Sequence, residues 1–353
     1  MNTIHIIPNP TGLMPYLTYW HEAFGNYGFD VKVYEPAEYS LKWKKPGEYE
    51  YRAGTVYELF KNWNVQSGDV IIVVDSWNPI TQMIMDYKLT TATDIRIFGF
   101  WTYNPYNSES KVWKVMKKEP DTRAWYYNMT KNLYGCYDYN CFFNDSHLDE
   151  FTRRQLRRNK EKFLFRKKLY VTGWPLDHVF ENDTKLEDKE NIVLLPLTAL
   201  NAAQRTLLTV IESQFPDWKF VYLQRSKPSR GSYLKYLKKA KIIFLNKKWE
   251  YDPTMIVEAM NYGVYPLIPN TRVAYRFTFP DKYWYNPLIL DPSLRYVNKT
   301  LWVIKNREGL IQRFADAMEN YESRYDEIIQ DAKSLTQQHF NSENFRKILF
   351  GSI

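Results

Sequence analysis

The feature that most constrains the fold is a run of five apolar residues without alternation, Val70 to Val74. A strand exposed on one face alternates apolar and polar residues, whereas a strand covered on both faces does not. Covering both faces requires crossover helices between parallel strands. The run therefore predicts a buried strand inside a parallel α/β sheet.

Similar short apolar runs alternate with helical patterns along the whole chain. Other strands are expected at 3–7, 31–34, 95–100, 139–143, 168–171, 191–195, 219–223, 241–245 and 264–268. Helices are expected at 13–24, 202–214, 232–240, 253–262, 307–333 and 343–349. Strands that alternate with helices indicate βαβ units, so we predict an α/β fold built from parallel sheets.

The length of 353 residues favours two domains over one growing core. Residues 173–190 contain Gly173 and Pro175 and then a charged stretch with few apolar residues, which is typical of a linker. We expect an N-terminal Rossmann-like domain over 1–172 and a C-terminal Rossmann-like domain over 191–320. The remaining helices, 321–353, are expected to pack back on the N-terminal domain.

The net charge of +8 is concentrated in one segment. Residues 153–168 contain nine Lys or Arg and one acid, Glu161, so this segment alone carries a charge of +8. A charge run is often a solvated helix face, but this concentration favours an anionic partner. No apolar run approaches the ~20 residues of a membrane helix, and the first residues lack a signal-peptide pattern. We therefore expect a soluble, cytoplasmic protein.

The most informative segment is 249–263, WEYDPTMIVEAMNYG. Asp252 is a suitable N-cap, Pro253 suits the first helical position and Gly263 suits the turn after the helix. A strand is expected on either side. In a parallel sheet, a helix that starts at a strand's carboxyl end presents unpaired N–H groups and its dipole to anionic ligands.

Within this segment, Glu250 and Glu258 are separated by seven residues, and Glu258 is followed by Ala259-Met260, then Gly263 and a predicted strand. This pattern resembles the E-x7-E motif of retaining GT-B glycosyltransferases, a family that includes sucrose synthases and many bacterial and phage enzymes. The clear match covers about 40 residues. The resemblance implies two Rossmann-like domains with a cleft between them, and transfer of a sugar from a nucleotide donor, UDP-linked by expectation.

The resemblance also implies roles for individual residues. Glu258 would accept hydrogen bonds from the ribose hydroxyls of the donor, and Glu250 would hold the donor sugar near its anomeric carbon, where the reaction occurs. Carboxylates form short, strong hydrogen bonds with hydroxyls, which suits both tasks. The donor site would further include Tyr251, Asp252, Thr254 and Met255.

The same segment is compatible with a simpler interpretation. On a helix, Thr254, Glu258 and Asn261 lie at positions i, i+4 and i+7, which is the spacing of a solvent-exposed stripe. The whole pattern of strand, cap, helix, glycine and strand favours the binding site.

The sequence departs from the family at the residues that are expected to bind the donor phosphates. The usual Gly-Arg and Lys after the first strand of the C-terminal domain are replaced by residues 196–205, PLTALNAAQR. The Gly-rich turn after the next strand is replaced by 224–231, QRSKPSRG. Arg225, Lys227 and Arg230 are candidates for the phosphate contacts, because guanidinium groups match phosphate geometry. Each is also compatible with an ordinary loop cation.

Acceptor groups are expected at the carboxyl ends of the N-terminal strands. Asp75 directly follows the run 70–74 and is a candidate to act as a base or to orient the acceptor hydroxyl. Gly12 would allow close backbone approach to the donor sugar or the acceptor, although it also suits a plain turn. His147 is a second candidate acid or base, although Ser146 predicts a helix N-cap beside it. Trp101 and Tyr103 are candidates for stacking on an extruded base, although each also suits the core. No Asp-x-Asp occurs, so we expect no metal and no cofactor beyond the donor.

Three partners fit the basic segment. The first is DNA bearing a hydroxymethylated pyrimidine, because phage enzymes that glycosylate modified bases share this architecture. Its phosphates would contact Arg153, Arg154, Arg157, Arg158 and Lys160. The second is an anionic membrane surface beside a lipid-linked or surface-glycan acceptor, although the segment has little apolar surface to insert. The third is nucleic acid bound without catalysis. The oligomeric state is not predicted.

Overall fold

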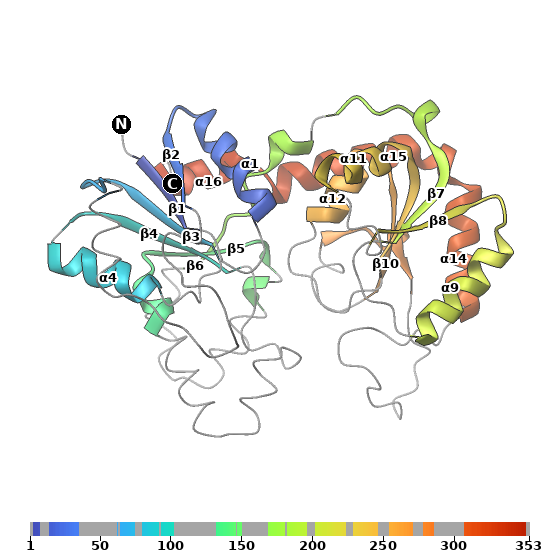
Figure 1. The fold of residues 1–353 in the computed structure, drawn as a ribbon, viewed down its shortest axis with the longest axis horizontal. Helices are drawn as coiled ribbons and strands as arrows, with labels where there is room; N and C mark the ends of the chain where they lie inside the picture. Colours follow the sequence, from blue (N-terminus) through green and yellow to red (C-terminus); the bar gives the residue numbers. More distant parts are fainter. Residues whose placement is uncertain are drawn as a thin grey trace, which may run out of the picture. The chain divides into compact units, whose positions relative to one another are not determined.

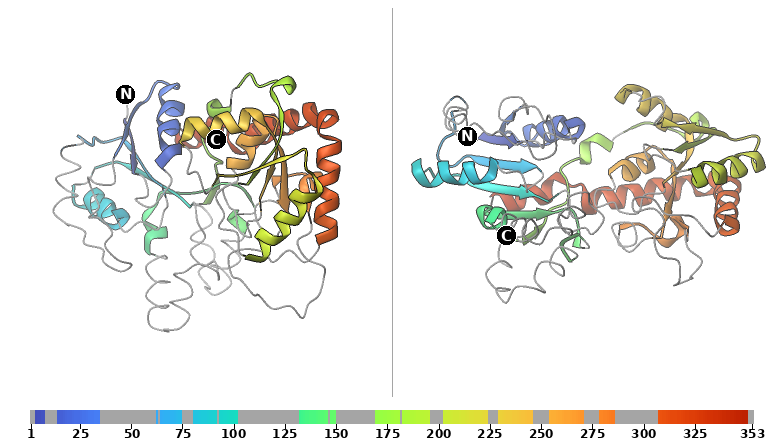
Figure 2. Two further views of the ribbon diagram at one scale, coloured as in Figure 1. Left: turned by 45° about the vertical axis from the view of Figure 1, so that its right-hand side comes forward. Right: turned by 60° about the horizontal axis from the view of Figure 1, so that its bottom comes forward.

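The computed structural model describes residues 3–7, 14–34, 62, 64–74, 80–91, 93–101, 132–145, 147–149, 169–180, 182–195, 202–223, 229–245, 254–270, 278–285 and 307–350. Their contacts divide the chain into two compact units. The first comprises Met1–Val179 with His339–Ile353, and the second comprises Phe180–Gln338. Each unit contains one parallel sheet with helices against it, as Figure 1 and the further views in Figure 2 show.

The first sheet has six strands in the order β2-β1-β3-β4-β5-β6, and every pair is parallel. The strands are β1 (Thr3–Ile7), β2 (Asp30–Val33), β3 (Val70–Val74), β4 (Arg96–Phe100), β5 (Tyr139–Phe142) and β6 (Leu169–Val171). All five residues of β3 are buried. The prediction of a doubly covered central strand at 70–74 is therefore confirmed.

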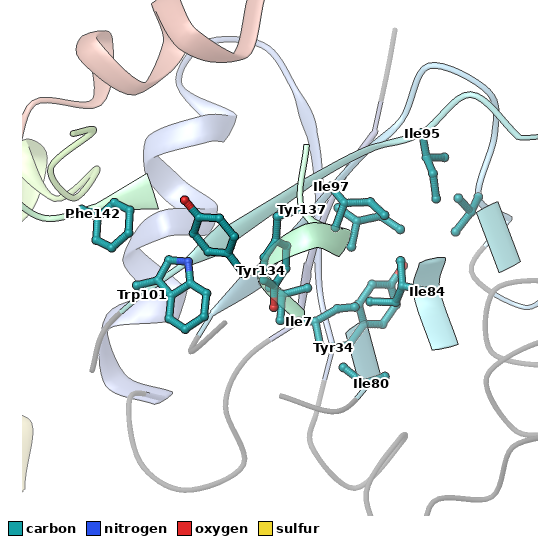
Figure 3. Packing of buried hydrophobic residues seen from close by; sticks show 13 residues of the cluster. Ile7, Tyr34, Ile80, Ile84, Ile95, Ile97, Trp101, Tyr134, Tyr137 and Phe142 are labelled. Carbon is teal, nitrogen blue, oxygen red and sulfur yellow. The ribbon is translucent and has the colours of Figure 1, made fainter. Parts of the chain in front are cut away.

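Two hydrophobic layers cover this sheet. On one face, Ile80 and Ile84 of α4 (Ile80–Thr91) pack in the cluster that includes Ile97 and Phe142 (Figure 3). The other layer is aromatic. Phe345 of α16 (Ser342–Phe350) lies 5.1 Å, centroid to centroid, from both Phe24 of α1 (Met14–Gly25) and Phe100 of β4. The last helix of the chain thus completes a core that its first helix begins.

The second sheet has five strands in the order β11-β10-β9-β7-β8, also parallel throughout. The strands are β7 (Glu190–Leu195), β8 (Lys219–Tyr222), β9 (Ala240–Phe244), β10 (Tyr265–Pro269) and β11 (Trp284–Tyr285). The two-residue strand β11 is too short to give a sequence signal, and it was absent from the predicted strands. Short 3-10 turns occur at η2 (Asp177–Phe180), η3 (Leu186–Asp188) and η4 (Asp281–Tyr283).

Successive residues of β9 face opposite layers. Ile243 packs with Leu237 of α11 (Arg230–Lys239) and Ala259 of α12 (Thr254–Asn261). The ring of the next residue, Phe244, packs at a tilt against that of Phe314 of α14 (Arg307–Glu319), with ring centroids 5.2 Å apart. Helix α9 (Ala202–Gln214) connects β7 to β8 and has the bounds that the sequence predicts. Helices α11 and α12 therefore share one face of the sheet.

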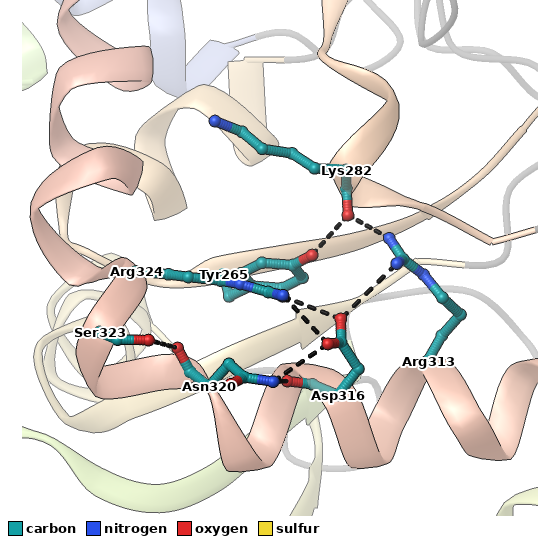
Figure 4. Close-up of polar contacts among 7 residues, drawn as sticks. All are labelled: Tyr265, Lys282, Arg313, Asp316, Asn320, Ser323 and Arg324. Carbon is teal, nitrogen blue, oxygen red and sulfur yellow. Dashed lines mark hydrogen bonds and ion pairs between the residues drawn. The ribbon is translucent and has the colours of Figure 1, made fainter.

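The helix predicted at 307–333 is two helices, since α14 ends at Glu319 and α15 (Tyr321–His339) begins after Asn320. The carboxylate of Asp316 accepts two hydrogen bonds from Arg324, at 2.9 and 3.0 Å. Close by, Tyr265 of β10 and Arg313 of α14 both donate to the carbonyl of Lys282, as Figure 4 shows. This network joins the corner between the helices to β10 and η4, so tertiary contacts fix a break that helical periodicity does not reveal.

The chain re-enters the first unit beside Gly173. The φ angle of Gly173 is +64°, in the region that favours glycine. The N–H of the next residue, Trp174, donates to the carbonyl of His339 at 2.8 Å, and Leu176 donates to Phe340 at 3.2 Å. A Cβ at position 173 would collide with the same His339 carbonyl. Both the backbone angle and the close approach therefore require glycine.

We expect Gly173→Ala to lower the free energy of unfolding by about 2 kcal/mol or more, because it combines a strained φ with a backbone collision. Urea unfolding measures the change. Gly135→Ala is the matched control: a Cβ there meets nothing within 4 Å, so the change should stay within about 0.5 kcal/mol. Equal stability of the two variants would contradict the account of this connection.

Candidate functional site

Strand order places the candidate site at one edge of the second sheet. The chain passes from β7 to β8 on one side and then crosses to β9 on the other side of β7. In sheets of this order, ligands bind outside the carboxyl ends of the two strands between which the order reverses. Those strands are β7 and β9, and α12 is the helix that follows β9. The segment selected from the sequence therefore follows the strand that this rule selects.

The polar side chains of α12 do not form an exposed stripe. Thr254 is 2% exposed and Glu258 is not exposed at all. Asn261 is half-buried, and its amide donates to the carbonyl of Val257 at 2.9 Å and to the hydroxyl of Thr336 at 3.1 Å. Met255 is also half-buried. The alternative of a solvated helix face is therefore wrong, and the burial of Glu258 needs another explanation.

The explanation is an ion pair with Arg230. Nη1 of Arg230 donates to Oε2 of Glu258 at 2.9 Å, and Nη2 donates to Oε1. Arg230 is the first residue of α11, and its guanidinium lies 5.6 Å from the centre of the Tyr233 ring one turn later. Both oxygens of the carboxylate are engaged by one planar group, which is the strongest arrangement available to this pair of residues.

The electrostatics of Glu258 are a balance of two effects. Burial raises the pKa of the Glu258 carboxyl, because the charged form loses its hydration, while the hydrogen bonds and charge of Arg230 lower it. The net direction is upward. An isolated carboxylate in this position is unfavourable, so a hydrogen-bonding or cationic partner is needed whenever it is ionised.

The corresponding edge of the first sheet lies between β1 and β3, which are neighbours in the order β2-β1-β3. Helix α1 follows β1 and α4 follows β3. The two predicted residues at this edge, Gly12 and Asp75, lie outside the described residues.

His147 lies in the interior of the first unit. It is 1% exposed, and its ring meets that of Phe142 edge-on at 5.3 Å. Burial lowers the pKa of His147 to about 3, because the imidazolium form would lose its hydration. A general base works best with a pKa near the operating pH, so this environment does not suit the catalytic role considered from the sequence. Oδ1 of Asn144 accepts from the backbone N–H of His147 at 2.9 Å, while Ser146, the predicted N-cap, lies outside the described residues.

Trp101 belongs to the core of the first unit (Figure 3). It is 1% exposed, and its indole N–H donates to Oδ1 of Asn140 at 2.8 Å. Its structural role is thus to connect the end of β4 with β5. Because this ring is buried, an extruded base cannot stack on it. We therefore do not retain Trp101 as a residue that binds the acceptor substrate.

The other predicted site residues lie outside the described part of the chain: Glu250, Tyr251, Asp252, Arg225, Lys227, Tyr103, Arg153, Arg154, Arg157, Arg158 and Lys160. Within the described part, no three His, Cys, Asp or Glu side chains are grouped so that they could hold a metal ion. None of the described helices is long and apolar enough to cross a membrane.

Similar solved structures exist for the full length of the chain. A sucrose-phosphate synthase from Thermosynechococcus elongatus matches 100% of both chains at 13% identity, with a TM-score of 0.57. The lipopolysaccharide outer core galactosyltransferase WaaB matches with 99% of this chain and 100% of its own at 11% identity, with a TM-score of 0.54. The chain has the GT-B fold.

A further GT-B match is the pneumococcal O-GlcNAc transferase GtfA in complex with UDP and GlcNAc. It covers 86% of this chain and 61% of the transferase at 11% identity, with a TM-score of 0.51. No protein-family model matches the sequence, and neither does any curated protein. The fold is thus established by structure, since sequence identity with these proteins is low.

The burial of His147 predicts a pH dependence of stability. Below its usual pKa of 6.5 the unfolded chain takes up a proton that the folded protein excludes down to about pH 3. His147 therefore lowers the free energy of unfolding by up to about 1.4 kcal/mol per pH unit as the pH falls through this range. We expect His147→Leu to remove this contribution, as measured by urea unfolding at several pH values. Parallel curves for the variant and the wild type would contradict the buried, neutral state.

Proposed function

We propose that the protein is a glycosyltransferase that moves a sugar from a UDP-linked donor to an acceptor hydroxyl. The observation that carries the proposal is the buried carboxylate of Glu258, on the helix that follows β9 at the ligand-binding edge of a GT-B sheet. The activities of the similar structures support it. One is a galactosyltransferase, and another is an O-GlcNAc transferase in complex with UDP and GlcNAc.

In this proposal the two glutamates bind different parts of the donor. Glu258 accepts hydrogen bonds from the two ribose hydroxyls, and Glu250 holds hydroxyls of the sugar. The backbone of 251–255 faces the sugar and the diphosphate. Arg225, Lys227 and Arg230 supply the positive charge that the family's missing phosphate cations would otherwise provide. A buried carboxylate suits a neutral diol, because the diol satisfies it without adding charge.

The proposed reaction retains the configuration of the anomeric carbon, as the E-x7-E resemblance implies. The bond between that carbon and the diphosphate oxygen breaks, and a bond to the acceptor oxygen forms. The acceptor's proton passes to the leaving diphosphate, so a separate general base is not required. Asp75 is the residue of the first unit that we propose to orient the acceptor hydroxyl.

Glu258→Ala is expected to abolish sugar transfer, because it removes both carboxylate oxygens that accept hydrogen bonds from the ribose hydroxyls. Turnover of a panel of sugar nucleotides measures the loss, and circular dichroism checks that the fold is intact. Glu322→Ala is the matched control, since that carboxylate is 73% exposed on α15 and should leave turnover unchanged. Full activity of Glu258→Ala would refute the site.

We further propose that the acceptor is DNA bearing a hydroxymethylated pyrimidine. The support is the charge of +8 within residues 153–168, which equals the net charge of the whole chain. Phosphate contacts with such a segment release counterions and make binding strongly dependent on salt. Mass spectrometry of nucleosides, after incubation of modified DNA with the protein and sugar nucleotides, tests the acceptor directly. A mass increase of one sugar on the modified base is the expected result.

The basic segment also yields a binding prediction. We expect the double variant Arg157→Ala/Arg158→Ala to weaken DNA binding and to reduce the slope of log affinity against log salt. The reduction should be about 0.9 for each phosphate that the variant no longer neutralises. The control variant is Lys185→Ala/Lys239→Ala, whose side chains are 71% and 56% exposed in the second unit. Identical slopes for both variants would count against DNA, and flotation with anionic liposomes would instead identify a membrane-surface acceptor.

A further inference from the structure

The pair formed by Arg230 and Glu258 is asymmetric in its exposure. The side chain of Glu258 is 0% exposed, whereas that of Arg230 is 30% exposed. Both carboxylate oxygens accept from the guanidinium, through Nη1 and Nη2. Arg230 is therefore the member of the pair that solvent reaches, and the carboxylate beneath it is covered.

A guanidinium fork and a ribose diol make the same demand on a carboxylate. Each presents two donors, side by side, to the two oxygens. The ribose contact proposed for Glu258 and the observed contact with Arg230 thus use the same acceptor atoms. A carboxylate has about four acceptor sites, so the two contacts compete for access and not for lone pairs: the side chain of Glu258 is 0% exposed while Arg230 is paired with it.

We propose that Arg230 and the donor ribose exchange places on Glu258: the guanidinium covers the carboxylate in the ligand-free protein, the ribose diol displaces it, and the freed guanidinium contacts the donor diphosphate. This inference rests on the proposed function, since it assumes that a nucleotide binds at this edge. It assigns Arg230 two successive partners in place of one.

The position of Arg230 supports this exchange. It is the first residue of α11, so it lies at the start of a helix that begins on the carboxyl side of the sheet, where phosphates bind in folds of this class. Its side chain is 30% exposed, so it is the part of the pair that solvent reaches. Its charge, once released, can pair with a phosphate, whose geometry a guanidinium matches as well as that of a carboxylate.

The burial of Glu258 explains why an exchange is needed. Because burial raises the pKa of the carboxyl, its ionised form depends on a partner in every state of the protein. Arg230 provides that partner before the donor binds and the diol provides it afterwards. The carboxylate of Glu258 therefore has hydrogen-bond donors both before and after the nucleotide binds.

The test compares uridine, which has a ribose but no phosphate, with UDP. In Arg230→Met the cover is absent, so uridine should bind more tightly. If Arg230 leaves Glu258 accessible in about one molecule of ten, its removal raises uridine affinity about tenfold. The diphosphate of UDP loses one of its three proposed cationic partners in the same variant, so the advantage of UDP over uridine should shrink about tenfold. Calorimetry is run at several alkaline pH values, because Arg230 lowers the pKa of Glu258 and its removal raises that pKa further.

A matched control is available in the same unit. Arg324 also forms a bidentate pair, with Asp316, but both side chains are similarly exposed, at 27% and 28%. Arg324→Met should leave both affinities at their wild-type values. Arg230→Lys keeps the charge without the fork, and its uridine affinity should fall between those of the wild type and Arg230→Met. The lysine variant also serves if the methionine variant does not fold.

The outcomes separate the two proposals. If the wild type binds neither uridine nor UDP, the proposed function fails at the donor, and the exchange fails with it. If the wild type binds both but uridine affinity does not rise in either Arg230 variant, the cover is refuted while the donor site stands. An unchanged advantage of UDP over uridine in Arg230→Met would refute the move to the diphosphate.

Discussion

Parallel pairing is the constraint on which the rest of this structure depends. Every strand pair in both sheets is parallel, so each connection must cross the sheet and all strands of a unit end at one edge. Helices therefore start at that edge. The strand order determines between which two neighbouring strands the connections run to opposite sides. Glu258 and Arg230 come from consecutive helices of this kind, α12 and α11. Their meeting follows from the topology of a sheet that the hydrophobic pattern already demands.

Local patterns predicted the elements of the fold well, because the signals are short-range. The apolar run at 70–74 and the helix at 202–214 have the predicted bounds. Helix α4 was not predicted, and two further failures are non-local. The break at Asn320 depends on the contact between Asp316 and Arg324 and on neighbours from β10 and η4, none of which alters helical periodicity. Strand β11 exists only because its two residues pair with β10.

The candidate site divides in the same way. The motif around Glu258 predicted the helix that carries this residue and the strand before that helix, because caps, glycine and residue spacing are local signals. The sequence did not reveal that Arg230, 28 positions earlier, engages both oxygens of that carboxylate. It offered Trp101 and His147 as functional residues because of their residue type and their position after predicted strands. Both lie in the core, where Trp101 pairs with Asn140 and His147 packs against Phe142.

The ring of Phe345 has a consequence for how the protein is made. It packs against Phe24, Phe98 and Phe100, which were synthesised long before it, and it belongs to the last helix of the chain. On the ribosome, the first unit therefore lacks part of its aromatic layer until Phe345 has emerged as well. The second unit is continuous in sequence and can fold while the first still waits. The unit whose first residues are synthesised earliest is therefore the unit that is completed last.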